Sequence, residues 1–109
     1  MLFRSQKSRE TAIQTALRGA AEVPLQVARN AVAIYERLGQ LEPIASASMS
    51  SDIRVGRLMA AAAVKGALEN VAINLESITD AEFAGRTRKE AASIEARVSD
   101  NVVGAGRNS

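Results

Sequence analysis

The first third of the chain carries apolar residues at alternating steps of four and three. These positions are Ile13, Leu17, Ala20, Pro24, Val27, Ala31, Ile34 and Leu38. Such spacing keeps one face of an α-helix apolar over about seven turns. Pro24 does not shift the phase of this stripe, although proline inside a helix removes a hydrogen bond and costs about 3 kcal/mol. We therefore expect one helix over about residues 7–40, kinked at Pro24; the alternative is two helices that meet near Glu22.

The middle of the chain predicts a long central helix. Residues 43–51 are Ser-rich without an apolar period and are expected to form a loop, from which Ser50 or Ser51 caps a helix over about residues 51–77. Small and polar residues follow one side of this helix: Asp52, Gly56, Ala60, Ala63, Ala67, Asn70 and Asn74. Apolar residues lie on both flanks of that side: Val55, Met59, Gly66 and Ile73 on one, and Ile53, Val64, Val71 and Ile78 on the other. A helix apolar on so many sides needs more neighbours than two partner helices supply.

A third helix is predicted over about residues 80–102. Thr79 with Glu82 three residues later has the form of a capping box. One apolar stripe follows: Phe83, Thr87, Ala91, Ile94 and Val98. No segment alternates as a half-buried strand would. The sequence therefore predicts an all-α chain, an up-and-down helical bundle fragment with long helices.

The two ends of the chain are expected to differ from the helical region. Residues 1–5, Met-Leu-Phe-Arg-Ser, match the translation of a common sequencing-adapter tail, and we expect them to be an artefact or disordered. Residues 6–103 are expected to form the helical domain. Residues 104–109 are expected to be a frayed tail.

Composition excludes several kinds of chemistry. The 109 residues include 21 alanines and only 3% aromatic residues, which favours close packing of helices. Without Cys or His, the chain can have neither a thiol nucleophile nor an imidazole base, and no thiolate or imidazole zinc ligand. The 14 basic residues are scattered and the net charge is only +2, so we expect no nucleic-acid partner. No apolar run approaches the roughly 20 residues of a membrane span, and no signal-peptide core is present, so we expect a cytoplasmic protein without a membrane partner.

Three polar residues share the small face of the central helix and are candidates for a functional site. Burying an amide without a partner costs about 1–3 kcal/mol, so Asn70 and Asn74 must either bond a neighbouring helix or face a cavity. Asp52 is expected in the first turn, where a carboxylate either stabilises the helix dipole or performs catalysis. Both interpretations stay open for each residue.

Basic residues lie on the opposite side of the same helix. Arg54, Arg57 and Lys65 form either a solvated surface or a rim that binds an anion. Tyr35, beside the stripe of the first helix, is expected to be a half-buried packing residue rather than an acid catalyst.

Four short segments occur in an order that resembles a known family. They are Ala-Ala-Glu-Val-Pro-Leu at 20–25, Ser-Asp at 51–52, Asn-Val-Ala-Ile-Asn-Leu at 70–75 and Ile-Thr-Asp-Ala-Glu-Phe at 78–83. Together they resemble the cyclodeaminase domain of formiminotransferase-cyclodeaminase, whose family includes stand-alone methenyltetrahydrofolate cyclohydrolases. The resemblance covers about Thr11 to Phe83. The family's N-terminal part, with a Gly-rich segment and an acidic helix carrying a catalytic Asp, has no counterpart, so the chain is expected to be the C-terminal portion of such a domain.

The resemblance implies a function in folate one-carbon metabolism. The domain would act on formimino- or methenyl-tetrahydrofolate without a metal or redox cofactor, and as a homodimer. In such a domain we expect Asp52 to be catalytic and Asn70, Asn74 and Arg57 to bind substrate. The alternative is a non-catalytic, Ala-rich helical interaction module.

Overall fold

The computed structural model describes the backbone of residues 2–108 and the side chains of residues 5–98. It contains α1 (Leu2–Leu41), a 3-10 turn η1 (Glu42–Ile44), α2 (Ala47–Leu75) and α3 (Ala81–Asn108). No strand occurs within residues 2–108, so the predicted all-α fold is confirmed. Of the expected artefact at residues 1–5 and the expected frayed tail at residues 104–109, Ser5 alone has a described side chain.

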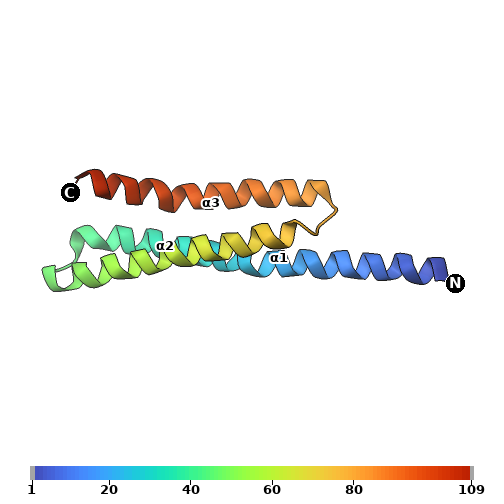
Figure 1. Ribbon diagram of the computed structural model, residues 1–109. Coiled ribbons are helices and arrows are strands. Elements are labelled where there is room, and N and C mark those ends of the chain that lie inside the picture. The colour runs from blue at the N-terminus through green and yellow to red at the C-terminus, as the bar shows by residue number, and fades with distance from the viewer. Residues whose placement is uncertain (1, 109) are drawn as a thin grey trace.

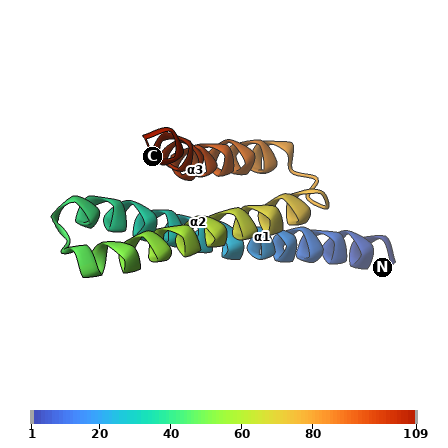
Figure 2. The ribbon, with the colours of Figure 1, turned by 60° about the vertical axis from the view of Figure 1, so that its left-hand side comes forward.

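The three helices form an elongated up-down-up arrangement of 69 × 22 × 15 Å. α1 and α2 run antiparallel and pack closely, whereas α3 returns parallel to α1 along one side of that pair (Figure 1). The turned view in Figure 2 shows the same separation of α3 from the α1–α2 pair. The N-terminal part of α1 extends beyond the ends of α2 and α3.

The core stripe of α1 differs from the predicted one. The structure has one continuous helix through Pro24 rather than two helices; the kink stays a prediction. Its buried residues are Ala21, Leu25, Ala28, Ala31, Val32 and Tyr35, whereas Ile13, Val27 and Ile34 of the predicted stripe are about half exposed. α1 is apolar on two adjacent stripes: Pro24 and Val27 of the predicted stripe border the groove against α2, whereas the second stripe also meets α3, which Tyr35 bonds through the Val98 carbonyl.

The start of α2 was also placed wrongly by the sequence. The helix begins at Ala47, four residues earlier than expected, because the chain reverses over the five residues 42–46, three of which form η1. Ser50 and Ser51 therefore lie inside the helix, and Ser46 precedes it without a side-chain cap; its Oγ lies 3.2 Å from the Oγ of Ser48.

The capping residue of α3 is Asp80 rather than Thr79. The Oδ1 of Asp80 accepts a hydrogen bond from the backbone N–H of Phe83 at 3.1 Å, as an N-cap carboxylate does. Glu82 instead pairs with Arg86 one turn later, so the predicted capping box does not form. The predicted stripe is correct: Thr87, Ile94 and Val98 are buried, and Phe83 and Ala91 pack against the core.

Two ion pairs connect the parallel helices α1 and α3. Arg29 donates to both carboxylate oxygens of Glu90, at 2.6 and 2.8 Å, and Arg97 donates to both of Glu36. Both acceptors are held in the charged form, because the hydrogen bond from Arg29 lowers the pKa of Glu90 and that from Arg97 lowers the pKa of Glu36. Each pair joins residues 61 positions apart, so the two pairs specify the same register.

One face of the α1–α2 pair is left uncovered. Its apolar side chains, each about half exposed or more, are Val23, Val27 and Ile34 on α1 and Val55, Met59 and Ile73 on α2. The expectation that the central helix would be incompletely covered is therefore confirmed. By length and composition alone, α2 is long and apolar enough to cross a membrane, as the core helices of soluble proteins also are. Of its most apolar 18-residue stretch, 39% is buried inside the structure.

Candidate functional site

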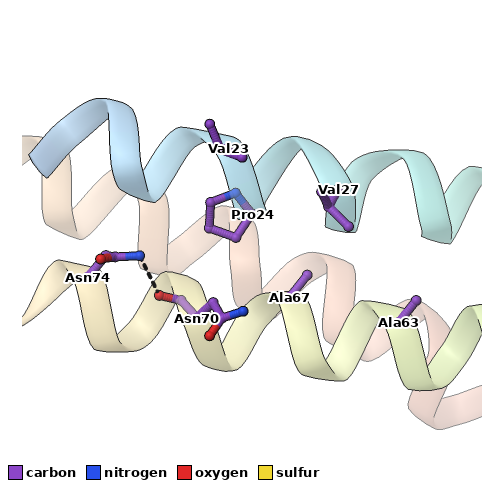
Figure 3. Close-up of a pocket in the computed structure, with 7 residues that line it drawn as sticks. All are labelled: Val23, Pro24, Val27, Ala63, Ala67, Asn70 and Asn74. Carbon is purple, nitrogen blue, oxygen red and sulfur yellow. Dashed lines mark hydrogen bonds between the residues drawn. The ribbon is translucent and has the colours of Figure 1, made fainter. Parts of the chain in front are cut away.

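A groove of about 500 Å³ lies between α1 and α2 beside Pro24. Its lining is aliphatic apart from two amides and consists of Val23, Pro24, Val27, Ala63, Ala67, Asn70 and Asn74 (Figure 3). The alanines leave room between the helices, since larger side chains at these positions would fill it. The predicted small face of α2 therefore does border a hollow, and Asn70 and Asn74 lie at one end of it.

Asn74 is bonded to the backbone of both helices. Its Nδ2 donates to the carbonyl of Ala20 on α1 at 3.2 Å and to the carbonyl of Asn70 at 3.0 Å (Figure 3 shows the second bond). Ala20 lies four residues before Pro24, which has no N–H, so this carbonyl lacks its ordinary helical donor. The Asn74 side chain supplies a donor in its place.

Asn70 has a different environment from Asn74. It is exposed at the groove, and its side-chain amide makes no hydrogen bond with any side chain or backbone group among residues 5–98. Its two N–H groups and its oxygen are thus available to a ligand or to water. Of the two amides, Asn70 is the one that can donate an N–H to a molecule in the groove without breaking an existing bond.

Asp52 does not share this groove. It is exposed in the second turn of α2, and a helical rise of 1.5 Å per residue puts it about 27 Å from Asn70 along the axis. It is neither in the first turn nor at the cap, because α2 begins earlier than predicted. The three polar residues share one face of α2 but do not form one site within a single chain.

Arg57 is held by groups at the connection between α1 and α2. Its guanidinium carbon lies 4.2 Å from the centre of the Tyr35 ring, its Nε donates to the Tyr35 carbonyl at 3.3 Å, and its Nη1 lies 3.6 Å from a carboxylate oxygen of Glu42. Gly39 makes this position possible, since a Cβ there would lie 3.0 Å from Nη2. Tyr35 is fully buried rather than half-buried, and its hydroxyl donates to the Val98 carbonyl at 3.4 Å.

The predicted basic rim is therefore partly neutralised. Arg54 lies 3.9 Å from the same Glu42 carboxylate that pairs with Arg57. A second, more polar hollow of about 640 Å³, lined by α1 residues around Glu36 and Arg37, contains none of the predicted site residues. Within the described side chains, no three acidic groups lie close enough together to hold a metal ion.

Sequence reasoning missed the α1 side of the groove. Pro24 and Val27 were assigned to a packing stripe rather than to a site, and Val23 was not singled out. The signal in the sequence was the mid-helix proline itself, because its missing N–H leaves the Ala20 carbonyl without its helical donor. Pairing that carbonyl with Asn74 requires the antiparallel register of α1 and α2, which a single sequence does not specify.

Comparison with known proteins agrees with the resemblance found in the sequence. The model of a family described as formiminotransferase-cyclodeaminase matches residues 4–93. The chain is 39% identical over 79 residues to the formimidoyltransferase-cyclodeaminase of Gallus gallus, covering 72% of this chain and 15% of that protein. The corresponding proteins of Rattus norvegicus and Sus scrofa are 35% and 33% identical over 86 residues, covering 79% of this chain and 16% of each relative. The chain thus spans about a sixth of these relatives, and no solved structure matches it significantly.

Proposed function

Because the chain belongs to the formiminotransferase-cyclodeaminase family, we propose that it forms part of a helical domain that acts on a tetrahydrofolate derivative in one-carbon metabolism. The observation that supports this proposal is the groove beside Pro24. Aliphatic walls suit the faces of a flat heterocycle, and amides suit the polar atoms at its edge. The parent reaction is either cyclodeamination or cyclohydrolysis, in the cytoplasm and without a metal or redox cofactor.

Both reactions need proton transfer and stabilisation of a cationic centre. In cyclodeamination, N10 of formimino-tetrahydrofolate bonds to the formimino carbon and loses its proton, while the departing nitrogen gains protons and leaves as ammonia. In cyclohydrolysis, water adds to the methenyl carbon and gives up a proton; the hydroxyl then becomes the formyl carbonyl as one carbon–nitrogen bond breaks and the released nitrogen takes up the hydroxyl proton. A carboxylate can accept such a proton and stabilise the cation, which is the role we propose for Asp52.

We propose that the polar end of the groove, formed by Asn70 and Asn74, receives the substrate. Asp52 and Arg57 lie outside it, so any part they have in the reaction requires a site completed by another chain or by a further part of the parent protein. For Arg57 that part would be attraction of the glutamate carboxylates at the end of a folate.

The decisive experiment measures folate binding and turnover separately. Titration of the 109-residue chain with 5-formyltetrahydrofolate, followed by calorimetry, should give saturable binding that Asn70→Leu abolishes without lowering the melting temperature. Turnover of formimino-tetrahydrofolate by the complete gene product should release ammonia while methenyl absorbance rises. Absence of both binding and turnover would overturn the proposal. Hydrolysis of the methenyl compound without ammonia release would identify the cyclohydrolase.

The uncovered apolar face favours a second element of the proposal, a homodimer. Side chains such as Val55, Met59 and Ile73 are more than half exposed, and contiguous apolar surface of this kind marks an interaction site. The same face supports the alternative function, a non-catalytic interaction module. A chain that self-associates but neither binds nor converts folate would be such a module.

A further inference from the structure

We infer that the two asparagines of the groove have different tasks: Asn74 positions α1 against α2 by supplying the hydrogen-bond donor that Pro24 lacks, and Asn70 alone donates hydrogen bonds to the ligand. The assignment of a ligand to Asn70 rests on the proposed function. The assignment to Asn74 rests on the hydrogen bonds of the chain itself.

The donors of Asn74 are fully engaged. An asparagine amide has two N–H groups, and the Nδ2 of Asn74 has two carbonyl acceptors, those of Ala20 and Asn70. A ligand could take an N–H from Asn74 only by breaking one of these bonds. Asn70 carries the same functional group at the same groove, and its side-chain amide has no hydrogen bond to another described residue.

The bond to Ala20 exists because of Pro24. With any other residue at position 24, the backbone N–H would donate to the Ala20 carbonyl in the ordinary helical pattern. Pro24 leaves that carbonyl open at the surface of α1 that faces α2, and the antiparallel register brings Asn74 opposite to it. The bond from Asn74 to the Ala20 carbonyl therefore depends on Pro24, and both Pro24 and Asn74 line the groove between the helices.

A double-mutant cycle tests the dependence of Asn74 on Pro24. In urea unfolding of the 109-residue chain, Asn74→Ala should reduce the folding equilibrium constant about three- to tenfold. In the Pro24→Ala background, where the new N–H satisfies Ala20, the same substitution should change it less than about twofold. Equal losses in the two backgrounds would overturn the inference. Asn30→Ala is the matched control, because Asn30 is an exposed asparagine of α1 bonded only to Gln26, and it should be silent in both.

Ligand affinity gives a second readout, because a residue with a purely structural role and a residue that bonds the ligand should change affinity in different backgrounds. Asn70→Ala should weaken binding of 5-formyltetrahydrofolate about tenfold while the urea midpoint stays unchanged. Asn74→Ala should weaken binding in the parent chain, whereas in the Pro24→Ala background it should leave the affinity of that background unchanged. Equal loss of affinity in both backgrounds would make Asn74 a direct contact and contradict the inference. If the parent chain binds no folate, the proposed function fails, while the unfolding cycle still decides the role of Asn74.

Discussion

At the scale of single residues, the sequence correctly grouped side chains that share a helix face but not those that meet across helices. Asn70 and Asn74 were predicted on one side with Ala63 and Ala67, and all four line the groove. The error for Asp52 came from the helix boundary: with α2 starting at Ala47, its carboxylate is no longer a first-turn group.

Asp52→Asn separates a structural role from a catalytic one. Because Asp52 is exposed and away from the helix terminus, the substitution should change the free energy of unfolding by less than about 0.5 kcal/mol. In the complete gene product, a catalytic role predicts a fall in kcat of at least about 100-fold. Thermal melting and steady-state turnover of the same preparation check both. Unchanged turnover would remove Asp52 from the proposed mechanism.

Arg57 should contribute to stability more than its neighbour Arg54. Arg57→Ala removes the contact with the Tyr35 ring and a partly buried ion pair, and should cost about 1–2 kcal/mol of unfolding free energy. Arg54→Ala removes only an exposed pair with the same Glu42 and should cost less than about 0.5 kcal/mol. Urea titrations of the two variants make the comparison. Similar losses for both would mean that net charge, rather than the position of Arg57, is what matters.

At the scale of helices, hydrophobic spacing identified all three elements, but it could not choose between adjacent stripes of α1. Val27 and Ile34 belong to one stripe, and Leu25 and Val32 belong to the other; both are apolar at helical spacing. The choice depends on where the neighbouring helices lie: Val27 of the first stripe borders an open groove against α2, whereas the second stripe also meets α3, which Tyr35 bonds. The starts of α2 and α3 were misplaced by four residues and one residue, because serine and threonine can cap a helix or lie within it.

The α1–α3 ion pairs should make stability depend on pH in the acidic range. The pKa values of Glu36 and Glu90 are lowered in the folded chain below their ordinary 4.5, so the unfolded state binds protons first as pH falls. This contribution is therefore complete above about pH 5 and is lost as pH falls below 4.5 through the lowered values. With side chains about 40% exposed, each pair should contribute no more than about 1 kcal/mol.

Urea unfolding at pH 7 and pH 3 measures this loss. The double variant Glu36→Gln, Glu90→Gln should be less stable than the parent at pH 7 and should lose less stability on acidification. If the parent and the variant lose the same amount, other carboxylates cause the acid sensitivity.

At the scale of the whole molecule, α3 covers only one side of the α1–α2 pair. We expect self-association through the uncovered face. Sedimentation velocity should show the weight-average mass rising with concentration, and Met59→Glu should shift the equilibrium toward monomer by at least about tenfold without lowering the monomer's stability, because Met59 is 69% exposed. A parent chain that stays monomeric at high concentration would contradict the homodimer.

The projecting N-terminal end of α1 has a consequence for local cooperativity. Residues 5–13 are all exposed, and Gln14 is the first described side chain bonded to another segment, through the Ser77 carbonyl and the Thr79 N–H. A helical arm shorter than about 12 residues is marginal in water without tertiary support. Its backbone amides should therefore exchange with deuterium through opening of the arm alone. Beyond Gln14 the exchange rate should fall steeply toward the slow rate set by global unfolding. In a mass-spectrometric exchange experiment, Gln14→Ala should move this boundary toward Leu17, so that one glutamine determines where the cooperatively unfolding part of a 40-residue helix begins.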